Sequence, residues 1–529
     1  MAQALFRMCA LYLTVAEINL SDVADRGITV TELAPIDQPV DLSRETTAAF
    51  VGRALRGPIN EPVLVKSFGE FRRRFGDSWS RSSLGPAAQQ FFEHGGRQLY
   101  IVRVANGARG AMLCLPASGS ALVLRAVEPG STELIRAAVD YDGIDAGNEE
   151  LFNLTLQRLD PASGLVVDQE LFPAVSYLDS STQFVVDMLL TSTLARVESP
   201  LPTHRPEPTA GAHTAFNSSY VVHTQAGADG QELSDYDLVG SRKLETGLFA
   251  LAGVADLDLL YLPPPGKRRD LGPTAVLAAE RFCRERGAML LLDPLQDWHS
   301  AADAMTGVRA LGYSSTNLLS YFPRMLERQE SGRQHRAVGG ALAGLLCKLD
   351  RKYGAWQQLD QRDLGFSRSL QPAVDVDASD ESALIRAGLN VIANGPTGAA
   401  QLRGSVTMAR GSSRQLVDLR ARRLCLRVIH AVDAATRWAV FAGDDMELAR
   451  RIRAQVTACL ASFVAMGAFA SDRFVVECDA GVRKRAGSAG QQFAIFLTFQ
   501  PLGATEPVAF TIHQTVAGSR VASTAFAPA

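Results

Sequence analysis

Glycine-rich and basic segments are the first places where this sequence could bind a phosphate group or a dinucleotide. Gly266-Lys267 lacks the upstream glycine and the following Ser or Thr of a phosphate-binding loop, and three prolines stand before it. Gly339, Gly340 and Gly344 lie in an apolar run, but their spacing is not that of a dinucleotide fingerprint. We therefore interpret the first pair as part of a rigid turn and the three glycines as positions of close backbone packing.

Aspartates at alternate positions could begin a calcium-binding loop. Asp375, Asp377 and Ser379 match its first half, but Asp380 stands where the loop requires glycine and Arg386 where it requires a bidentate glutamate. The start of a helix, capped by one of these side chains, accounts for the segment better. We therefore predict no calcium site here.

Serine and histidine chemistry has equally little support. The segment 487–490 has Ala486 where a nucleophile elbow needs glycine, so we interpret it as a loop between strands. None of the eight histidines forms an HxH or HxxxH pair. His430 lies in a predicted helix of mixed polarity, where we expect a packed or surface residue and not a catalytic base. The sequence thus predicts no catalytic residue, no cofactor and no metal site.

Length, charge and cysteine usage describe an ordinary globular protein of several domains. The chain has 529 residues, of which 47% are hydrophobic and 21% charged, and its net charge is −3. This length exceeds the ~250–300 residues that one hydrophobic core serves, and the balanced charge gives no basic face for nucleic acid. The seven cysteines are odd in number, dispersed and never paired as CxxC. They predict neither a disulfide framework nor a zinc site, and they favour a reducing cytoplasm.

Two apolar stretches could be targeting or membrane segments. Ala4 to Ala16 contains one arginine, lacks a clear small-x-small cleavage site and runs into Glu17, so a signal peptide is the weaker interpretation. Val456 to Ala470 is rich in alanine and shorter than the ~20 residues that a bilayer requires. We expect this second stretch to pack inside the protein, without membrane insertion.

The elements that would position any site begin with short strands and capped helices. Gly27 to Pro35 alternates apolar and threonine residues, which predicts a strand, and Thr47 to Gly52 predicts a second one. Ser67, with Glu70 as in a capping box, predicts the start of a helix. Another helix is expected to stop at a Gly-Gly pair before the strand Leu99 to Val104.

The middle of the chain changes first to a β pattern and then to an α/β pattern. Ala105 to about Thr224 contains strand-sized alternating segments, such as Ala121 to Ala126 and Leu151 to Leu159, and we interpret it as an inserted, mainly-β domain. From Glu245 onward, strands alternate with helices, which predicts a parallel sheet covered by helices. The expected elements are Leu257 to Leu262, Pro273 to Gly287, Ala288 to Leu292, Ser300 to Leu311 and Asn317 to Phe322.

Two long helices and three strands are expected at the C-terminal end. The helices span Leu416 to Thr436 and Glu447 to Met466, and Asp444 and Asp445 precede the positive end of the second. The strands are Arg473 to Glu477, Gln492 to Gln500 and Val508 to His513. The expected fold class is therefore α/β and α+β, with several domains.

Three blocks of short motifs occur in order along the chain. The first contains Ile28 to Pro35, Thr47 to Gly52, Arg56 to Pro58, Asn60 to Val63, Phe91 to Gly96 and Tyr100 to Val104. The second contains Gly227 to Gly230, Gly247-Leu248 and Tyr261 to Pro263. The third contains Val338 to Gly340, Asp350-Arg351, Gly354 to Trp356, Arg437 to Phe441 and Phe474 to Asp479. Together they resemble the tail sheath family of contractile phage tails, tailocins and related bacterial injection systems.

Two segments depart from the family pattern. Ala442 to Asp445 replaces a frequent Glu-Pro-Asn-Asp run, although the acidic helix start is kept. The loop Val482 to Gly487 is basic and small where the family usually has Thr and Asn, so contacts made by that loop are not carried over.

The resemblance implies a structural subunit that stacks as rings around an inner tube and contracts to drive the tube through a target envelope. The implied organisation is an N-terminal arm at 1–46, core parts at 47–104 and 331–505, an inserted outer domain at 105–224, an α/β domain at 225–330 and a C-terminal arm at 506–529. The implied partners are further copies of the chain, the tube protein, and baseplate and terminal cap proteins. Assembly is expected in the cytoplasm, as part of a phage tail or of a released or anchored particle.

The resemblance also implies functional residues. The two arm strands that would add to neighbouring subunits contain Ile28, Thr29, Val30, Thr31, Glu32, Leu33, Val508, Ala509, Phe510, Thr511 and Ile512. The alternative is that both strands complete the subunit's own sheet. Arg450, Arg451 and Arg453 are candidates for contact with an acidic tube, and a solvated helix face is the alternative there. The alternative functions are a non-contractile, baseplate-like structural component and an α/β hydrolase.

Overall fold

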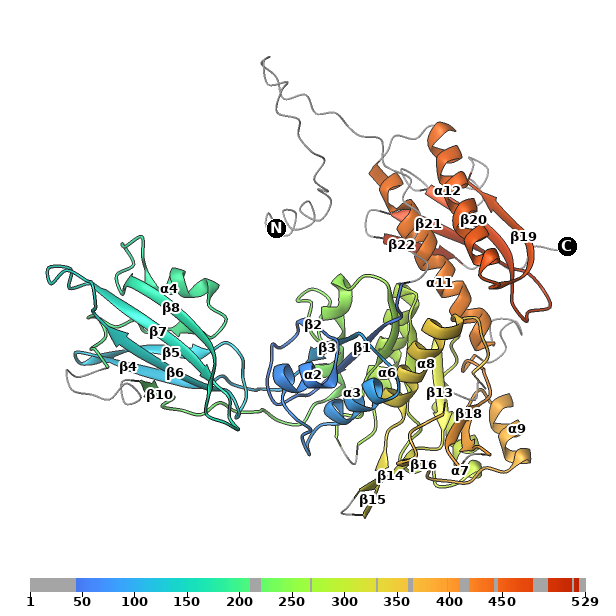
Figure 1. Ribbon diagram of the computed structural model, residues 1–529, viewed down its shortest axis with the longest axis horizontal. Coiled ribbons are helices and arrows are strands. Elements are labelled where there is room, and N and C mark those ends of the chain that lie inside the picture. The colour runs from blue at the N-terminus through green and yellow to red at the C-terminus, as the bar shows by residue number, and fades with distance from the viewer. Residues whose placement is uncertain are drawn as a thin grey trace. The chain divides into compact units, whose positions relative to one another are not determined.

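The structure, a computed structural model, describes residues 44–209, 220–266, 269–329, 332–359, 365–396, 398–409, 418–441, 446–478, 493–515 and 518–522 (Figure 1). All of them belong to one unit that begins at Pro39. The predicted strand Gly27 to Pro35, the acidic pair Asp444-Asp445 and the segment 482–490 lie outside the described residues.

Strand β1 (Thr47–Gly52) lies inside an eight-stranded sheet and pairs in parallel on both sides. Ala48 and Phe50 face one side of the sheet, Ala49 and Val51 face the other, and all four are fully buried. Such a run of apolar residues is typical of a parallel strand that is covered on both faces. The strands in order are β18 (Ala400–Arg403), β17 (Asn390–Asn394), β13 (Leu318–Phe322), β12 (Met289–Leu292), β11 (Leu257–Tyr261), β1, β3 (Leu99–Arg103) and β2 (Pro62–Val65).

Helices pack on both faces of this main sheet. One core joins the sheet to α2 (Phe68–Phe75), α3 (Leu84–Glu93) and α8 (Gly339–Tyr353). A second core joins the opposite face to α5 (Asp235–Val239), η4 (Gly247–Gly253) and α6 (Pro273–Arg286). A smaller cluster holds α7 (Ala301–Leu311) and α9 (Ala378–Arg386) against β13 and β17.

The helix caps follow the local sequence. Ser67 accepts a hydrogen bond from the Glu70 N–H at 3.1 Å, as the capping-box prediction requires. The Glu70 carboxylate accepts instead from the Lys66 N–H at 2.8 Å, one residue before the cap. The predicted α/β elements between residues 257 and 322 are confirmed, each within one residue of its expected ends.

The main sheet crosses the predicted division between a first core part at 47–104 and a separate α/β domain at 225–330. β1 pairs directly with β11, from Thr47 opposite Leu257 to Phe50 opposite Tyr261. β17 and β18, from the segment expected to be the second core part, belong to the same sheet. Local sequence patterns contain no information on such distant parallel pairing, and this explains the difference.

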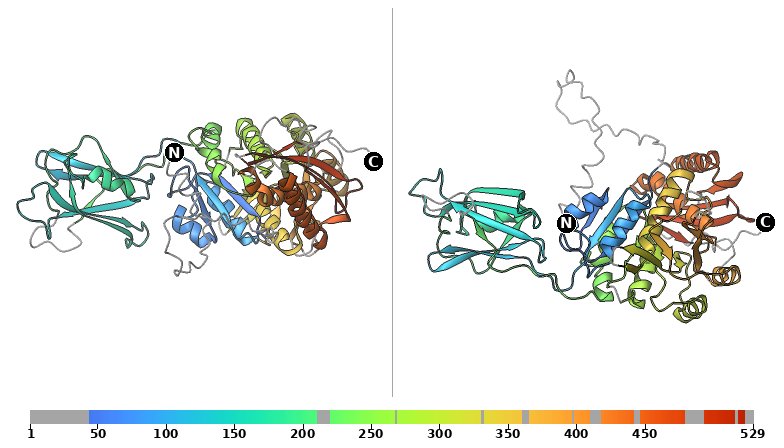
Figure 2. Two further views of the ribbon diagram at one scale, coloured as in Figure 1. Left: turned by 90° about the horizontal axis from the view of Figure 1, so that it is seen from above. Right: turned by 60° about the horizontal axis from the view of Figure 1, so that its bottom comes forward.

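The segment between β3 and β11 contains two further sheets with a core of their own (Figure 2). Their inward residues come from both sheets, with Leu113, Leu124, Val139 and Leu154 at most 1% exposed. The strands expected at 121–126 and 151–159 are confirmed. The elements are β4 (Met112–Ala117), β5 (Ser120–Ala126), β9 (Ala195–Glu198), β10 (Val221–Val222), β6 (Leu134–Asp140), β7 (Leu151–Leu159), β8 (Val166–Ser176), α4 (Val185–Met188) and η2 (Leu189–Thr191).

Arg103, the last residue of β3, fastens the start of this inserted segment. Its side chain is 1% exposed, and its guanidinium donates to the carbonyl oxygens of Ala54, Leu55, Gly57 and Pro129. Burial lowers the pKa of Arg103 to about 10, which still leaves it charged at neutral pH. One buried cation therefore ties the loop after β1 to a turn of the inserted segment.

The C-terminal residues form two helices against one antiparallel sheet. The sheet order is β19 (Phe469–Glu477), β20 (Phe493–Pro501), β21 (Val508–Thr515) and β22 (Gly518–Ala522). α11 (Leu419–Thr436) continues into η5 (Arg437–Phe441), and α12 (Met446–Ala465) follows. The rings of Phe463, Phe469, Phe499 and Phe510 pack in succession between the helix and the sheet. A separate three-stranded sheet contains β14 (Met325–Gln329), β15 (Gly332–Arg336) and β16 (Leu370–Pro372).

Arg103→Ala is expected to lower the free energy of unfolding by about 3 kcal/mol, because buried carbonyl groups lose a charged donor. Arg72→Ala is the control: Arg72 pairs with Asp77 at 2.8 Å, but both side chains are more than half exposed. The control should change stability by at most about 0.5 kcal/mol. Thermal and denaturant unfolding would measure both, and equal losses would contradict the role given to Arg103.

Phe510→Ala is expected to destabilise the C-terminal sheet by about 3–5 kcal/mol, because the ring is 5% exposed and packs on Phe499. Amide hydrogen exchange of residues 493–515, measured on dilute monomeric protein, should become faster. Val475→Ala is the control, since Val475 is 45% exposed on β19. Unchanged exchange in the Phe510 variant would mean that β21 does not pair within its own chain.

Candidate assembly site

The residues expected to link subunits fall in different places. The first arm strand, Ile28 to Leu33, lies outside the described residues, and the described chain begins at Arg44. The second, Val508 to Ile512, is the first part of β21. The three arginines expected at the tube, Arg450, Arg451 and Arg453, lie in the first turns of α12. The structure does not bring these groups together into one site.

Strand β21 is paired on both edges within its own chain. β20 pairs with it from Phe499 opposite Val508 to Phe493 opposite Gln514. β22 pairs with the other edge, from Thr511 onward. This is the arrangement in which the strand completes the subunit's own sheet. To add to a neighbour, residues 508–512 would have to leave this sheet, because β20 pairs with all of them and β22 pairs with Thr511 and Ile512.

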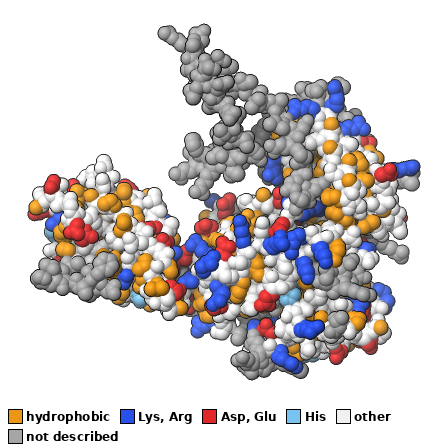
Figure 3. Space-filling view, in the orientation of Figure 1, with side chains coloured by type: hydrophobic (Ala, Val, Ile, Leu, Met, Phe, Trp, Pro, Cys, Tyr) orange, Lys and Arg blue, Asp and Glu red, His pale blue; other side chains and the backbone are white. Residues whose placement is uncertain are grey.

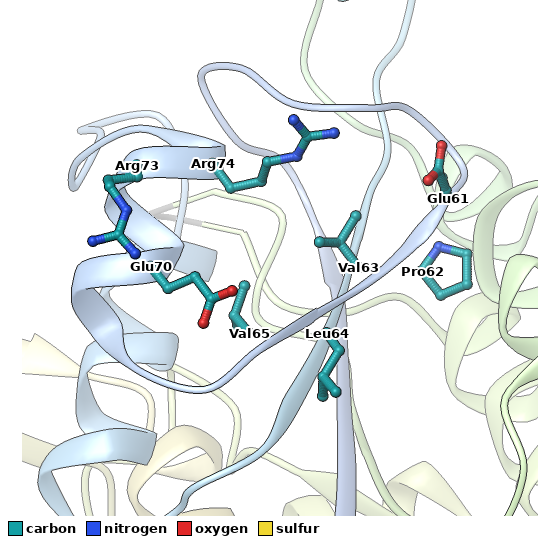
Figure 4. Close-up of a pocket in the computed structure, with 8 residues that line it drawn as sticks. All are labelled: Glu61, Pro62, Val63, Leu64, Val65, Glu70, Arg73 and Arg74. Atoms are coloured by element: carbon teal, nitrogen blue, oxygen red, sulfur yellow. The ribbon is translucent and has the colours of Figure 1, made fainter. Parts of the chain in front are cut away.

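Open strand edges are the places where a neighbour's strand could add. Within the described residues, β2 and β18 end the main sheet, and β19 and β22 end the C-terminal sheet. A groove of about 600 Å³ runs beside β2, with Val63 and Val65 on one wall and Glu70, Arg73 and Arg74 of α2 on the other (Figure 4).

Three of these four edges carry features that discourage strand pairing. β2 begins with Pro62, which has no N–H group, and is followed by the exposed Lys66. β18 has four residues. β19 has an irregular register between Phe469 and Phe474 and carries Asp472 and Arg473 in that interval. Of these four edges, the outer edge of β22 is left as a candidate acceptor for an added strand, and the end strands of the other three sheets are further candidates.

The basic side chains of α12 differ in their surroundings. Arg450 and Arg453 are exposed, whereas Arg451 is partly buried and its guanidinium lies 5.0 Å from the ring centre of Trp438. Trp438 also donates from its indole N–H to Gln455 at 2.9 Å. Arg451 therefore helps to hold η5 against α12. Basic side chains are also visible on the surface around α11 and α12 (Figure 3).

At the carboxyl ends of the parallel strands, where α/β enzymes bind their ligands, Asp293 is held by the chain itself, and a pocket of about 730 Å³ lies alongside, lined in part by Pro264, Arg324 and Glu327. Asp293 follows β12 and accepts from the Tyr261 hydroxyl at 2.6 Å and from the Val338 and Gly339 N–H groups at 2.9 Å. Burial raises the pKa of Asp293, although these donors act against the rise. The amides that begin α8, which would otherwise suit a phosphate, thus hold an internal carboxylate. The cavity beside it has about 10 Å³.

The glycines of α8 are packing positions, as predicted. A Cβ on Gly339 would stand 2.2 Å from the ring of Tyr261, and one on Gly340 would stand 2.4 Å from the Ala87 carbonyl oxygen. A Cβ on Gly344 would meet the Phe91 carbonyl oxygen at 2.4 Å. These glycines let α8 pack directly on α3 and the sheet.

The structure also describes Asp377 and His430, the other two residues that the sequence offered for a calcium site and a catalytic base. Asp377 is the N-cap of α9 and accepts from the Asp380 N–H at 2.8 Å, so the helix-start interpretation is confirmed. His430 is a packed residue, 8% exposed. Among the described residues, no group of His, Cys, Asp and Glu side chains could hold a metal ion, and no helix is long and apolar enough to cross a membrane.

One cluster was not anticipated from the sequence. Asp258, at the start of β11, lies between Arg44, Arg427 and His430. Two features of the sequence could have indicated this cluster. Asp258 interrupts an otherwise apolar strand, and Arg423, Arg427 and His430 are spaced to share one face of α11.

No family model and no curated protein matches this sequence. Similarity is found at the level of structure. A sheath tail protein from Listeria innocua superposes with a TM-score of 0.61 at 12% identity, covering 89% of this chain and 94% of that one. A sheath tail protein from Desulfitobacterium hafniense gives 0.53 at 12% identity, covering 92% and 99%.

A third match is a contracted sheath. The helical sheath of the anti-feeding prophage in its contracted state gives a TM-score of 0.51 at 13% identity, covering 90% of this chain and 96% of that one. All three matches cover about nine-tenths of this chain and at least 94% of the other chain. The chain therefore has the fold of the sheath proteins of phage tails and contractile injection systems.

Proposed function

We propose that this chain is the sheath subunit of a contractile tail or contractile injection machine. The observation that carries the proposal is the likeness over about nine-tenths of the chain to the contracted anti-feeding prophage sheath and to a contracted extracellular injection-system sheath. Agreement over nearly the full length of both chains argues for the same kind of assembly more strongly than a shared domain would. In this role the subunit polymerises around an inner tube and shortens the polymer by rearrangement.

Strand addition between subunits is the proposed linkage. The predicted strand Ile28 to Leu33 would supply apolar residues on one face and threonines on the other. Among the edges of the main and C-terminal sheets, the outer edge of β22 is our preferred acceptor, because β2, β18 and β19 carry features that oppose pairing. Each backbone hydrogen bond would contribute about 0.5–1.5 kcal/mol, so many such links can hold subunits together while their rigid parts rotate.

The same proposal assigns α12 to the tube. Arg450 and Arg453 are exposed on its first turns, where two cations could face an acidic surface. Arg451 has a second task beside Trp438, so its contribution to binding is harder to isolate. Baseplate and cap proteins would bind the two ends of the polymer, and assembly would take place in the cytoplasm.

Two other functions are less well supported. A hydrolase would need polar side chains that are available to a substrate, but Asp293, Tyr261 and Arg324, at the carboxyl ends of the strands, make contacts within the chain. A non-contractile, baseplate-like component would share the fold but would form closed rings rather than long tubes.

Removal of residues 1–35 should give a folded monomer that does not polymerise, because the linking strand is lost. Sedimentation and light scattering would measure polymerisation, and circular dichroism would check the fold. Normal polymers from the shortened chain would contradict the linking role of this strand.

Arg453→Glu is expected to reduce the fraction of sheath that sediments with the inner tube by about tenfold at low salt, because an attractive charge becomes repulsive. Assembly of empty sheath should be unaffected. Arg309→Glu is the control, since Arg309 is also exposed but lies on α7. An unchanged tube-bound fraction for Arg453→Glu would exclude this face of α12 as the tube contact.

A further inference from the structure

The first described residues of the chain are held by polar contacts to residues distant in the sequence. Arg44 donates from both terminal nitrogens to the two oxygens of Asp258, at 2.8 Å each. The Arg44 carbonyl accepts from Arg427. Thr46 donates from its hydroxyl to Asp350 at 2.5 Å, and the Thr47 N–H donates to Asp258 at 2.9 Å.

Asp258 is the centre of the first group of contacts. Its side chain is 14% exposed, and Arg427 approaches it at 3.4 Å in addition to Arg44. Burial alone would raise the pKa of Asp258, but the neighbouring arginines, Arg44 first, hold that pKa well below its usual range. Asp258 therefore stays ionised at any physiological pH. The ring of His430 closes the group, with Nδ1 3.0 Å from Arg44 and Nε2 3.1 Å from the Arg286 carbonyl oxygen.

Asp350 is the centre of the second group. It lies in the last turns of α8 and accepts from Thr46 and from Arg423 of α11, each at 2.5 Å. The side chains of Asp350 and Arg423 are both 6% exposed. Arg423 and Arg427 are one helical turn apart, so one face of α11 contacts both aspartates.

Segment 44–47 is thus bound to three elements that come from distant parts of the sequence: β11, α8 and α11. Buried ion pairs add little net stability compared with apolar side chains of the same volume. Their directional contacts do fix positions, and breaking one leaves an uncompensated charge. This arrangement is therefore better suited to hold a segment in one place than to stabilise the fold in general.

We propose that Asp258 and Asp350, with Arg44, Arg423 and Arg427, form an anchor that fixes where the N-terminal arm leaves the subunit. The inference rests on the proposed sheath function, in which tension between subunits passes along residues 1–43 and enters the fold at Arg44. The anchor divides that tension between the main sheet, through β11 and α8, and the C-terminal sheet, through α11. The named side chains are positioning residues, since they act on the arm through segment 44–47.

Asp258→Asn in the full-length chain is the direct test, because the change keeps the shape and removes the charge. Amide hydrogen exchange of residues 44–52 should become about tenfold faster, as expected for the loss of a hydrogen bond to a charged group. Polymers of the variant should form but break into shorter pieces during contraction, as measured by their length distribution before and after. Arg44→Gln, at a side chain that is 21% exposed, is a second variant in case the first fails to fold.

Asp270→Asn is the matched control. It breaks the Arg324–Asp270 ion pair, which is 2.5 Å long and, like the Arg44–Asp258 pair, partly buried, at the other end of the parallel strands. The control should leave exchange at residues 44–52 and the polymer lengths as in the unmodified chain. If amide exchange at residues 44–52 is unchanged in both anchor variants, the anchor does not exist. If exchange becomes faster but the polymers keep their length during contraction, the anchor exists but does not carry tension. If the unmodified chain forms no polymers, the sheath function fails, while the exchange measurement still decides whether the anchor exists.

Discussion

The parallel pairing of β1 with β3 and β11 is the constraint on which the rest of the structure depends. It places a strand from the beginning of the described chain inside a sheet in which β11, β12, β13, β17 and β18 all follow a long inserted segment. Closing so long a loop costs conformational entropy. The burial of apolar residues on both faces of β1 offsets this cost. Once β1 is fixed, the inserted segment must leave after β3 and return before β11.

Both ends of β1 consequently become attachment points. At its start, segment 44–47 meets Asp258 and Asp350, and the described chain begins there. After its last residue, Arg53 donates to the Asp229 and Gly230 carbonyl oxygens, and Arg103 ties the adjoining loop to the inserted segment. The two parts of the chain that a contracting sheath would have to carry are therefore joined to the ends of one buried strand.

Much of this fold could be predicted from the sequence, because periodicity and capping are local. The strands and helices between residues 257 and 322, the cap at Ser67 and the packing role of Gly339 and Gly340 are examples. The single main sheet and the position of β21 between two strands could not be predicted, since strand order depends on distant pairing. The contacts of Asp258 were missed for the same reason: its partners lie far away in the sequence, on segment 44–47 and on α11.

Electron microscopy of the purified full-length protein would decide whether this chain polymerises as a sheath. We expect long hollow tubes of stacked rings with a lumen wide enough for an inner tube. Monomers, or closed rings that never stack, at protein concentrations where related sheaths polymerise would contradict it.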